Sequence, residues 1–228
     1  MDPSLLKQLL QEVAAGRRSV DEAAGQLTHL AVEDIHYAHI DHHRSLRKGF
    51  PEVIFGMGKS ADQIAGIMAH MIDQEKVILV TRVDADKARE LLAAFPQAVY
   101  HADACMLILQ NAVLPDLGRG TILVISAGTS DIPVAREAYL TAAAMGNTVE
   151  AIFDVGVAGI HRLLSYRREI QEANVLVVVA GMEGALPSVV AGMVGRPVIA
   201  VPTSVGYGVS LGGLTALFGM LNSCSSNV

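Results

Sequence analysis

Hydrophobic positions in the second half of the chain alternate between unbroken β-type runs and helical spacing. The β-type runs cover 121–126, 148–153, 175–180 and 197–201, and helical segments between them cover 132–145, 160–172 and 186–194. Strands made almost wholly of Val, Ile and Leu are typical of parallel sheets that are buried on both faces. The pattern therefore predicts a three-layer parallel α/β domain.

The first half has a less regular pattern. Helical spacing predicts two short helices within 3–30, and β-type and helical runs then alternate as 52–55, 60–73, 77–81, 84–95 and 104–109. The loop 115–120 combines Pro, Asp and two Gly residues, so we place a domain boundary there. We expect a smaller helical and α/β domain over 1–118 and a nucleotide-binding α/β domain over 119–228.

Composition narrows the class of protein. The chain has 228 residues, of which 51% are hydrophobic, so it can bury a large core. It has no apolar run of about 18 residues, the length that spans a bilayer. Asp2, Lys7 and Glu12 near the start are unlike a secretory signal. We therefore expect a cytoplasmic protein that does not enter the membrane.

Charge and cysteine usage restrict the partners. The formal net charge of −6 argues against a nucleic-acid surface, which needs clustered Lys and Arg. Cys105 and Cys224 lie far apart, as expected for reduced thiols rather than for a disulfide framework. The apolar surplus consists of small residues with few aromatics, which suits subunit interfaces, so we expect a homo-oligomer.

Each predicted strand of the second half is followed by a loop with glycines and polar groups. These loops are 126–131, 154–161, 181–184 and 202–213. In a parallel sheet they converge at one edge, where backbone N–H groups and helix N-termini can bind a phosphate or a carboxylate. One such loop alone is an ordinary start of a helix, with Ser130 or Asp131 as N-cap, but four together favour a ligand site.

Individual side chains leave alternatives open. Glu183 follows an apolar strand where a general base would be placed, although it can equally be a solvated loop acid. Cys224 lies in a polar stretch that could expose its thiol, whereas a buried free cysteine is the commoner case. Cys105 stands in an apolar run and is assigned to the core. Lys59 follows a glycine pair that lacks P-loop spacing, and it can still pair with an anion.

Four histidines lie close together in the first half, at His36, His39, His42 and His43. His39 and His43 have the spacing of helical metal ligands, but nothing else in the sequence supports a metal site. Asp41, Arg44, Arg47 and Lys48 are interleaved with them. A solvated or substrate-contacting segment is therefore the favoured interpretation.

Several long motifs in the same order resemble the LarB family over nearly the whole chain. They are Asp41–Arg44, Gly49–Lys59, Ser126–Pro133, Asp154–Arg162, Ala180–Pro187 and Asn222–Cys224. The second half is also similar to aminoimidazole-ribonucleotide carboxylases of purine synthesis. In that family a catalytic His follows Gly-Gly-Ala-Ala, whereas Ala185 stands at the matching place here. This departure argues against the purine reaction.

The resemblance implies a carboxylase and hydrolase that begins synthesis of the nickel-pincer nucleotide cofactor. Such an enzyme converts nicotinic acid adenine dinucleotide (NaAD) and CO2 or bicarbonate into pyridinium-3,5-biscarboxylic acid mononucleotide and AMP. The resemblance also implies an octamer. It places Cys224 as the nucleophile that adds to the pyridinium ring, and we assign Glu183 as the base and His161 as the alternative proton carrier.

The remaining expectations concern ligands. Mg2+ is plausible for cleavage of the anhydride, although no ligands are identified, and no organic cofactor is expected because NaAD is the substrate. The alternatives are a purine-pathway carboxylase or mutase and a catalytically inactive nucleotide-binding protein. The second alternative is kept because family members continue past the cysteine with a Gly-rich, Asn-Asp-containing tail that this sequence lacks. The expected substrate-binding residues are Gly128, Thr129, Ser130, Asp131, Asp154, Gly156, Gly159, Arg162, Gly181, Met182, Gly184, Lys59 and Arg44.

Overall fold

A computed structural model describes residues 2–28 and 32–228. The chain divides into two compact units, residues 1–114 and 115–228. We call them the N-terminal unit and the C-terminal unit and describe each by itself. The division falls within the same loop region in which the sequence analysis placed a domain boundary.

The C-terminal unit is built on a four-stranded sheet in the order β10–β9–β7–β8, and every pair of neighbours is parallel. The strands are β7 (Thr121–Ser126), β8 (Thr148–Ile152), β9 (Val175–Ala180) and β10 (Val198–Pro202). The predicted parallel sheet is confirmed. All four strands therefore end at the same edge.

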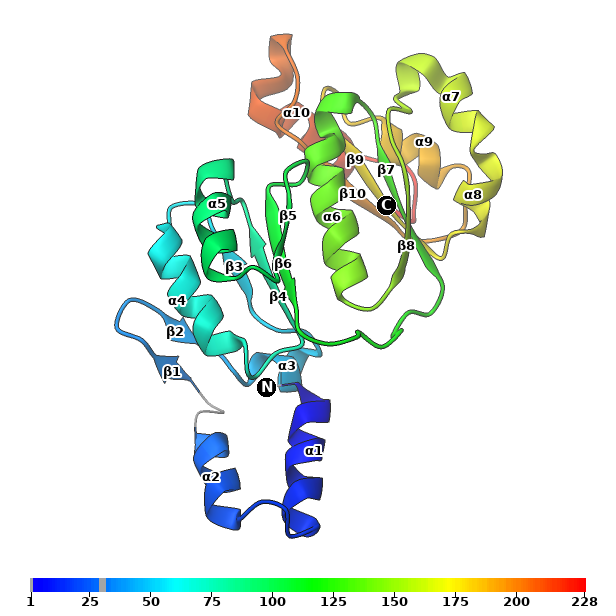
Figure 1. Cartoon of the computed structure of the whole chain (residues 1–228). Helices are drawn as coiled ribbons and strands as arrows, with labels where there is room; N and C mark the ends of the chain where they lie inside the picture. The colour runs from blue at the N-terminus through cyan, green and yellow to red at the C-terminus, as the bar shows by residue number, and fades with distance from the viewer. Residues whose placement is uncertain (1, 29–31) are drawn as a thin grey trace. The chain divides into compact units, whose positions relative to one another are not determined.

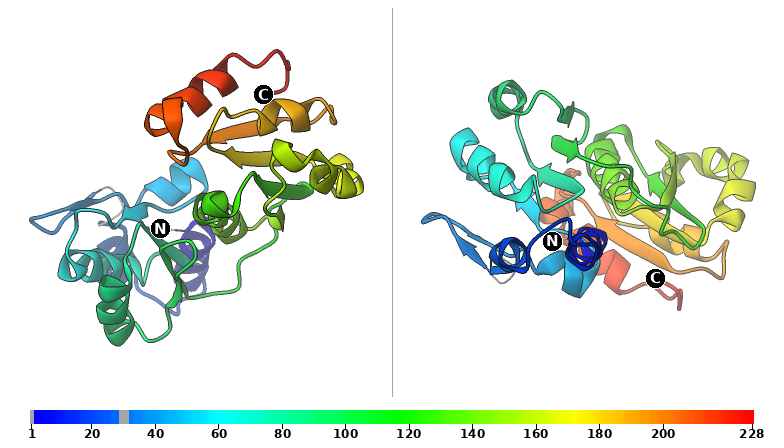
Figure 2. Two further views of the ribbon diagram at one scale, coloured as in Figure 1. Left: turned by 90° about the horizontal axis from the view of Figure 1, so that it is seen from above. Right: turned by 60° about the horizontal axis from the view of Figure 1, so that its bottom comes forward.

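Helices cover both faces of this sheet, as Figures 1 and 2 show. α6 (Ile132–Ala144) lies on one face, where Ala135 packs against Val124 and Val179. The opposite face is packed by α7 (Ile160–Ser165), α8 (Arg167–Glu172), α9 (Leu186–Ala191) and α10 (Leu214–Leu221). The unit therefore has the three predicted layers.

One predicted helix of this unit is divided. The helical pattern over 160–172 reads as one helix, but the backbone leaves helical geometry at Tyr166, with φ −101° and ψ 22°, between α7 and α8. Short 3₁₀ turns, η1 (Thr129–Asp131), η2 (Val157–Gly159) and η3 (Gly208–Gly213), precede the helices that follow β7, β8 and β10. They shape the edge where the strands end.

The N-terminal unit has a mixed sheet in the order β3–β4–β6–β5. β3 (Val53–Phe55) and β4 (Val77–Thr81) are parallel, whereas β6 (Met106–Gln110) is antiparallel to β4 and to β5 (Val99–His101). α4 (Ala61–Met71) follows β3 and α5 (Ala85–Ala94) follows β4. The sequence pattern did not predict β5.

The assignment of Cys105 to the core is wrong. The predicted strand over 104–109 begins only at Met106, because residues 102–105 form the tight turn between β5 and β6. Cys105 is exposed there and has a positive φ of 49°. An apolar run that contains a hairpin turn looks like one strand in the sequence.

The first fifth of the chain holds α1 (Pro3–Ala14) and α2 (Val20–Thr28), followed by a hairpin of β1 (Glu33–Asp34) and β2 (His39–Ile40) and by α3 (Arg44–Lys48). The two expected helices within 3–30 are present, and positions 29 and 30 of that range lie outside the described residues. None of the helices in residues 2–28 and 32–228 has the length and apolar character needed to cross a bilayer.

Candidate functional site

The loops that follow all four strands, β7, β8, β9 and β10, line one pocket of about 450 Å³ in the C-terminal unit, as the sequence analysis expected. Its lining includes ten residues that the sequence analysis singled out: Gly128, Thr129, Ser130, Asp131, Asp154, Gly156, Arg162, Gly181, Met182 and Glu183. A cavity of this size accommodates a small ligand or a large part of a nucleotide. Parallel strand direction brings these residues together, although they are spread over more than fifty positions of the sequence.

Asp131 is buried and connects two of these loops. Its Oδ2 accepts a hydrogen bond from the N–H of Gly128 at 2.9 Å, and its Oδ1 accepts one from the hydroxyl of Thr203 at 2.7 Å. Asp131 occupies the N-cap position of α6 but makes no side-chain cap there. The predicted N-cap position is therefore confirmed for Asp131, but its carboxylate is used by the preceding turn and by the loop after β10 instead of capping α6.

The loop after β8 carries an ion pair at the pocket. Arg162 Nη1 donates to Asp154 Oδ2 at 2.6 Å, and both side chains are about half exposed. Asp154 has a positive φ of 59°, and its N–H donates to the buried hydroxyl of Ser126 at 3.3 Å. A Cβ on Gly159 would lie 2.7 Å from Arg162 Nε, so the guanidinium lies directly over that glycine. Gly159 therefore shapes the site without lining the pocket.

The loop after β9 is packed against two other segments. A Cβ on Gly181 would lie 2.2 Å from the carbonyl oxygen of Val205, and Met182 N–H donates to that same oxygen at 2.9 Å. A Cβ on Gly219 in α10 would lie 2.3 Å from the carbonyl oxygen of Glu183. The backbone of this loop is therefore held from both sides, while the Glu183 side chain is exposed at the pocket. Gly184 is buried beneath it, with a φ of 68°.

Cys224 and His161 do not line this pocket. Cys224 is exposed in the segment after α10, where Ser223 Oγ lies 2.8 Å from Ser188 Oγ of α9. Asn227 Nδ2 fixes the same segment by donating to the carbonyl oxygens of Ala191, Val194 and Arg196. His161 is exposed on α7 beside Arg162. Within the C-terminal unit, Cys224 therefore does not line the pocket at which Glu183 is exposed.

Lys59 and Arg44 belong to the N-terminal unit and lie at opposite ends of β3. Lys59 follows the strand, and its Nζ donates to the carbonyl oxygen of Phe55 at 2.8 Å. Arg44 begins α3, which precedes the strand, and its side chain is exposed. Their roles in substrate binding stay predictions.

The histidine-rich segment is partly structural. His42 is 1% exposed, and its Nε2 lies 2.8 Å from Glu33 Oε2, while His70 Nδ1 lies 2.9 Å from Glu33 Oε1. The hydrogen bond with His42, followed by the one with His70, holds the pKa of Glu33 below its usual range. A solvated role is therefore wrong for His42, which holds the β1–β2 hairpin through Glu33.

No site for a metal ion can be assigned. Throughout residues 2–28 and 32–228, no three His, Cys, Asp or Glu side chains are placed to hold a metal ion. The pocket does hold three carboxylates, Asp131, Asp154 and Glu183, and one guanidinium, Arg162. Its formal charge is therefore negative. Asp131 and the Asp154–Arg162 pair are already engaged within the protein, so these side chains identify no ligands for the expected Mg2+ ion.

Three residues that shape the pocket were not singled out from the sequence. They are Thr203, Val205 and Gly219, which contact the loops after β7 and β9. Thr203 was the most accessible to sequence reasoning, since it is the first residue beyond β10 and begins a loop already recognised as part of the edge. The contact of Gly219 with Glu183 had no local signal.

The parallel sheet with its Gly-rich loops at one edge defines an AIR carboxylase-type domain. Residues 121–227 match the AIR carboxylase family. Residues 32–111 match the family described as the LarB/PurE-like N-terminal domain. The chain belongs to the LarB family, whose members are enzymes of the LarB/AIR carboxylase group, and the PurE-like family binds nucleotide substrates.

Two individual proteins extend this comparison. The uncharacterized protein MJ0165 of Methanocaldococcus jannaschii is 38% identical over 231 aligned residues, which cover 98% of this chain and 89% of MJ0165. A solved structure of a PurE2 variant from Treponema denticola is 19% identical, with a TM-score of 0.37 over 47% of this chain and 67% of its own. The assignment rests on the family matches and on MJ0165.

Proposed function

We propose that this protein converts NaAD and CO2 or bicarbonate into pyridinium-3,5-biscarboxylic acid mononucleotide and AMP. The observation that carries the proposal is the pocket of about 450 Å³ in which the loops after β7, β8, β9 and β10 meet, in a chain of the LarB family. Ala185 lines this pocket at the place where the purine-pathway relatives need a histidine. The LarB-type reaction is therefore favoured over the purine reaction.

The carboxylation step needs a nucleophile, because a pyridinium ring is itself an electrophile. In the proposed mechanism the Cys224 thiolate adds to C4 of the ring, and the ring electrons form an enamine that is nucleophilic at C5. C5 then attacks CO2 and forms a carbon–carbon bond. Glu183 removes the C5 proton, and departure of the thiolate restores the aromatic ring. His161 is the alternative carrier of that proton.

The charge of the pocket supports binding of the pyridinium ring. The carboxylates at the pocket can attract the positive ring nitrogen locally, whereas the Arg162 guanidinium is placed to attract the phosphates. Glu183 is exposed at the pocket with its backbone fixed by Val205 and Gly219, so it is available to a bound ring. A fixed backbone with a free carboxylate is the arrangement that a general base requires.

Cleavage of the pyrophosphate develops negative charge, which positive groups and N–H donors stabilise. We place Thr129, Ser130, Asp131, Gly159, His161 and Arg162 around the phosphates and ribose. Asp131 acts indirectly, by holding the surrounding loops, since both of its carboxylate oxygens accept hydrogen bonds within the protein. Arg162 is the cation of the pocket lining. Mg2+ stays a prediction, and no step is assigned to it.

The position of Cys224 outside the pocket of its own C-terminal unit bears on assembly. We propose that the thiol meets the substrate where copies of the chain contact one another in a homo-octamer. η3, α10 and the loop before them expose six large apolar side chains: Tyr207, Val209, Leu211, Leu214, Phe218 and Leu221. Exposed apolar surface of this density is typical of protein interfaces, and Tyr207 also lines the pocket.

The assembly is tested by light scattering and mass photometry of the purified protein. We expect the wild-type chain to form a homo-oligomer and Phe218→Glu with Leu221→Glu to dissociate it, while Val113→Glu, an equally exposed site in the other unit, leaves it intact. A monomeric wild-type protein would contradict this part of the proposal.

The reaction is tested by incubating the protein with NaAD, bicarbonate and Mg2+, followed by nucleotide analysis and intact-protein mass spectrometry. We expect AMP and the doubly carboxylated pyridinium mononucleotide. Cys224→Ala should abolish product, whereas Cys105→Ala, which removes the other exposed thiol, should leave it unchanged. Tight NaAD binding without product or thiol adduct would instead identify a nucleotide-binding protein without this chemistry.

A further inference from the structure

The loops after β7, β9 and β10 meet at one buried side chain. Thr203 is 5% exposed and directly follows β10, and its N–H donates to the carbonyl oxygen of Ala180 at 3.0 Å. A Cβ on Gly181 would lie 2.8 Å from the Thr203 hydroxyl, which therefore passes over a residue that has no side chain. Because Gly181 has no side chain, the Thr203 side chain has room to reach Asp131.

The hydrogen bond between Thr203 and Asp131 joins positions 72 residues apart. Asp131 is 3% exposed, so its carboxylate has little access to water. Both groups seen to donate to it, the Thr203 hydroxyl and the Gly128 N–H, are neutral. A buried carboxylate is costly unless such donors are in place, so removal of one donor favours movement of the carboxylate toward another donor or toward water.

Movement of Asp131 would change the pocket directly. The carboxylate holds the N–H of Gly128, and Gly128, Thr129 and Ser130 form the turn that lines the pocket. A carboxylate released from Thr203 would turn toward the pocket and displace this turn. It would also add unscreened negative charge where the nucleotide phosphates are proposed to bind.

We propose that Thr203 is a positioning residue for nucleotide binding, which acts by holding Asp131 and through it the Gly128–Ser130 turn. The inference rests on the proposed function only in that the pocket is taken to bind a nucleotide. Thr203 itself does not line the pocket. Its effect on the ligand is therefore exerted entirely through Asp131.

The test compares two substitutions that differ in one group. Thr203→Val keeps the branched shape and loses the hydroxyl, whereas Thr203→Ser keeps the hydroxyl and loses a methyl. Binding of NaAD and of AMP is measured by titration calorimetry. Loss of a hydrogen bond to a buried charge predicts that Thr203→Val weakens NaAD binding by about 10- to 100-fold. Thr203→Ser should remain within about 3-fold of wild type.

A double-mutant cycle with Asp131→Asn isolates the bond. The asparagine keeps its carbonyl toward the Gly128 N–H and turns its amide toward the Thr203 hydroxyl, which can accept as well as donate. Since no buried charge remains, Thr203→Val should change affinity by less than about 3-fold in this background. Equal effects of Thr203→Val in both backgrounds would overturn the inference.

A matched control separates positioning from stability. Asn174 Oδ1 accepts a hydrogen bond from the N–H of Thr121 at 3.0 Å, at the start of β7 and so at the opposite edge of the same sheet. Asn174→Ala should lower the unfolding temperature while NaAD affinity stays unchanged. If it weakens binding as much as Thr203→Val does, the inference is wrong.

The outcomes also separate this inference from the proposed function. Wild-type protein that binds neither NaAD nor AMP overturns the proposed function. Wild-type protein that binds NaAD, with Thr203→Val binding equally well, overturns only the role of Thr203.

Discussion

The two units use their sheets differently. In the C-terminal unit all four strands are parallel, so every loop that follows a strand reaches the same edge. In the N-terminal unit only β3 and β4 are parallel, and the antiparallel β5 and β6 turn back within one hairpin. A parallel sheet collects residues from distant parts of the sequence into one pocket, whereas a mixed sheet of the same size distributes them over both of its ends.

The helices that follow the first strand, in chain order, of each four-stranded sheet show a second contrast. α4 begins with a local capping box, in which Ser60 accepts from the N–H of Gln63 and Gln63 accepts from the N–H of Ser60. α6 begins at Asp131, whose carboxylate bonds to Gly128 and Thr203 instead. The start of α4 depends on neighbouring residues, whereas the start of α6 also depends on a contact across the sheet.

The largest expected effect comes from disrupting the packing of the loops at the edge where the strands of the C-terminal unit end. Gly181→Ala would place a Cβ 2.2 Å from the carbonyl oxygen of Val205, and the backbone there is held by several loops. We expect a loss of about 3 kcal/mol in the free energy of unfolding. Gly195→Ala is the control, since its Cβ would have no neighbour within 4 Å. Denaturant unfolding measures both, and equal stabilities would contradict the close packing.

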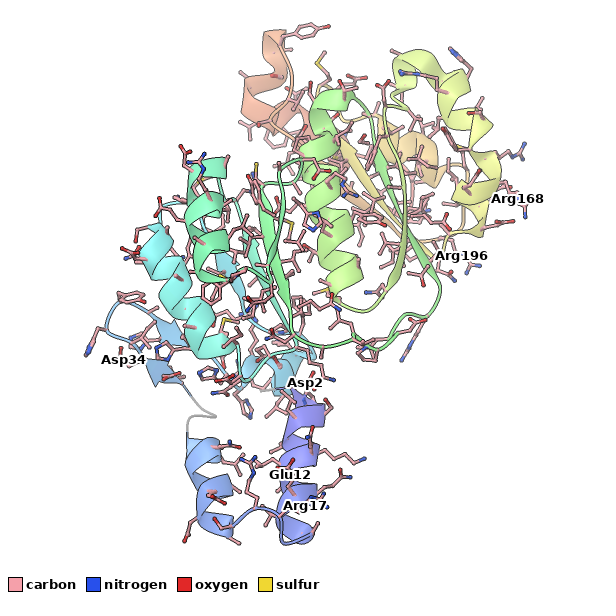
Figure 3. All side chains as sticks on the ribbon, viewed as in Figure 1. Asp2, Glu12, Arg17, Asp34, Arg168 and Arg196 are labelled. Carbon is pink, nitrogen blue, oxygen red and sulfur yellow. The ribbon has the colours of Figure 1, made fainter. Side chains whose placement is uncertain are left out.

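A smaller effect is expected on ligand affinity without loss of the fold. Arg162→Ala removes the guanidinium from the pocket and leaves Asp154 unpaired. We expect NaAD binding to weaken about 10-fold, which corresponds to about 1.4 kcal/mol. Arg168→Ala is the control, because Arg168 pairs with Glu172 on α8 and points away from the sheet (Figure 3). Equal loss in both variants would indicate a general charge effect.

A third prediction concerns the local cap of the N-terminal unit. Ser60→Ala removes the acceptor for the N–H of Gln63 and should cost about 1 kcal/mol. Hydrogen exchange followed by mass spectrometry should show faster exchange in α4 and unchanged exchange in β7–β10. If Ser60→Ala changed NaAD affinity as much as Arg162→Ala does, the prediction would be wrong. The two helices would then not differ in how their starts affect the pocket.

The smallest effect is a pH dependence confined to the N-terminal unit. Hydrogen bonds with His42 and then His70 lower the pKa of Glu33, so the unfolded chain binds a proton there more readily than the folded chain does. The stabilisation is therefore present above about pH 4.5 and is lost as the pH falls through the lower folded pKa. We expect a loss of up to about 1 kcal/mol.

Glu33→Gln tests this pH dependence, because the amide cannot titrate. In a series of unfolding measurements from pH 6 to pH 3, the difference in stability between wild type and variant should shrink as the pH falls. A constant difference would show that protonation of Glu33 does not contribute.

Much of the fold could be predicted because buried strands carry their own pattern. The predicted runs 121–126 and 175–180 coincide with β7 and β9, and 77–81 coincides with β4. β5 was missed because three residues are too few to show an alternation. The division between α7 and α8 was missed because the residues around Tyr166 keep helical spacing even though the backbone does not.

The lining of the pocket was more predictable than its support. Glycines and polar residues after each strand mark the lining directly in the sequence. The hydrogen bond between Asp131 and Thr203 depends on the order β10–β9–β7, which local patterns do not specify. The approach of Gly219 to Glu183 likewise exists only after α10 has packed on the sheet.

The packing of α10 leads us to expect that activity depends on protein concentration. Gly219 and Ala216 on the inner side of this helix touch the backbone of Glu183 and Gly184, while Phe218 and Leu221 project from its outer side. In the homo-oligomer proposed above, a contact on the outer side of α10 would therefore bear on the loop that carries the proposed base. Dilution should lower the specific activity as subunits separate, well before any of them unfolds.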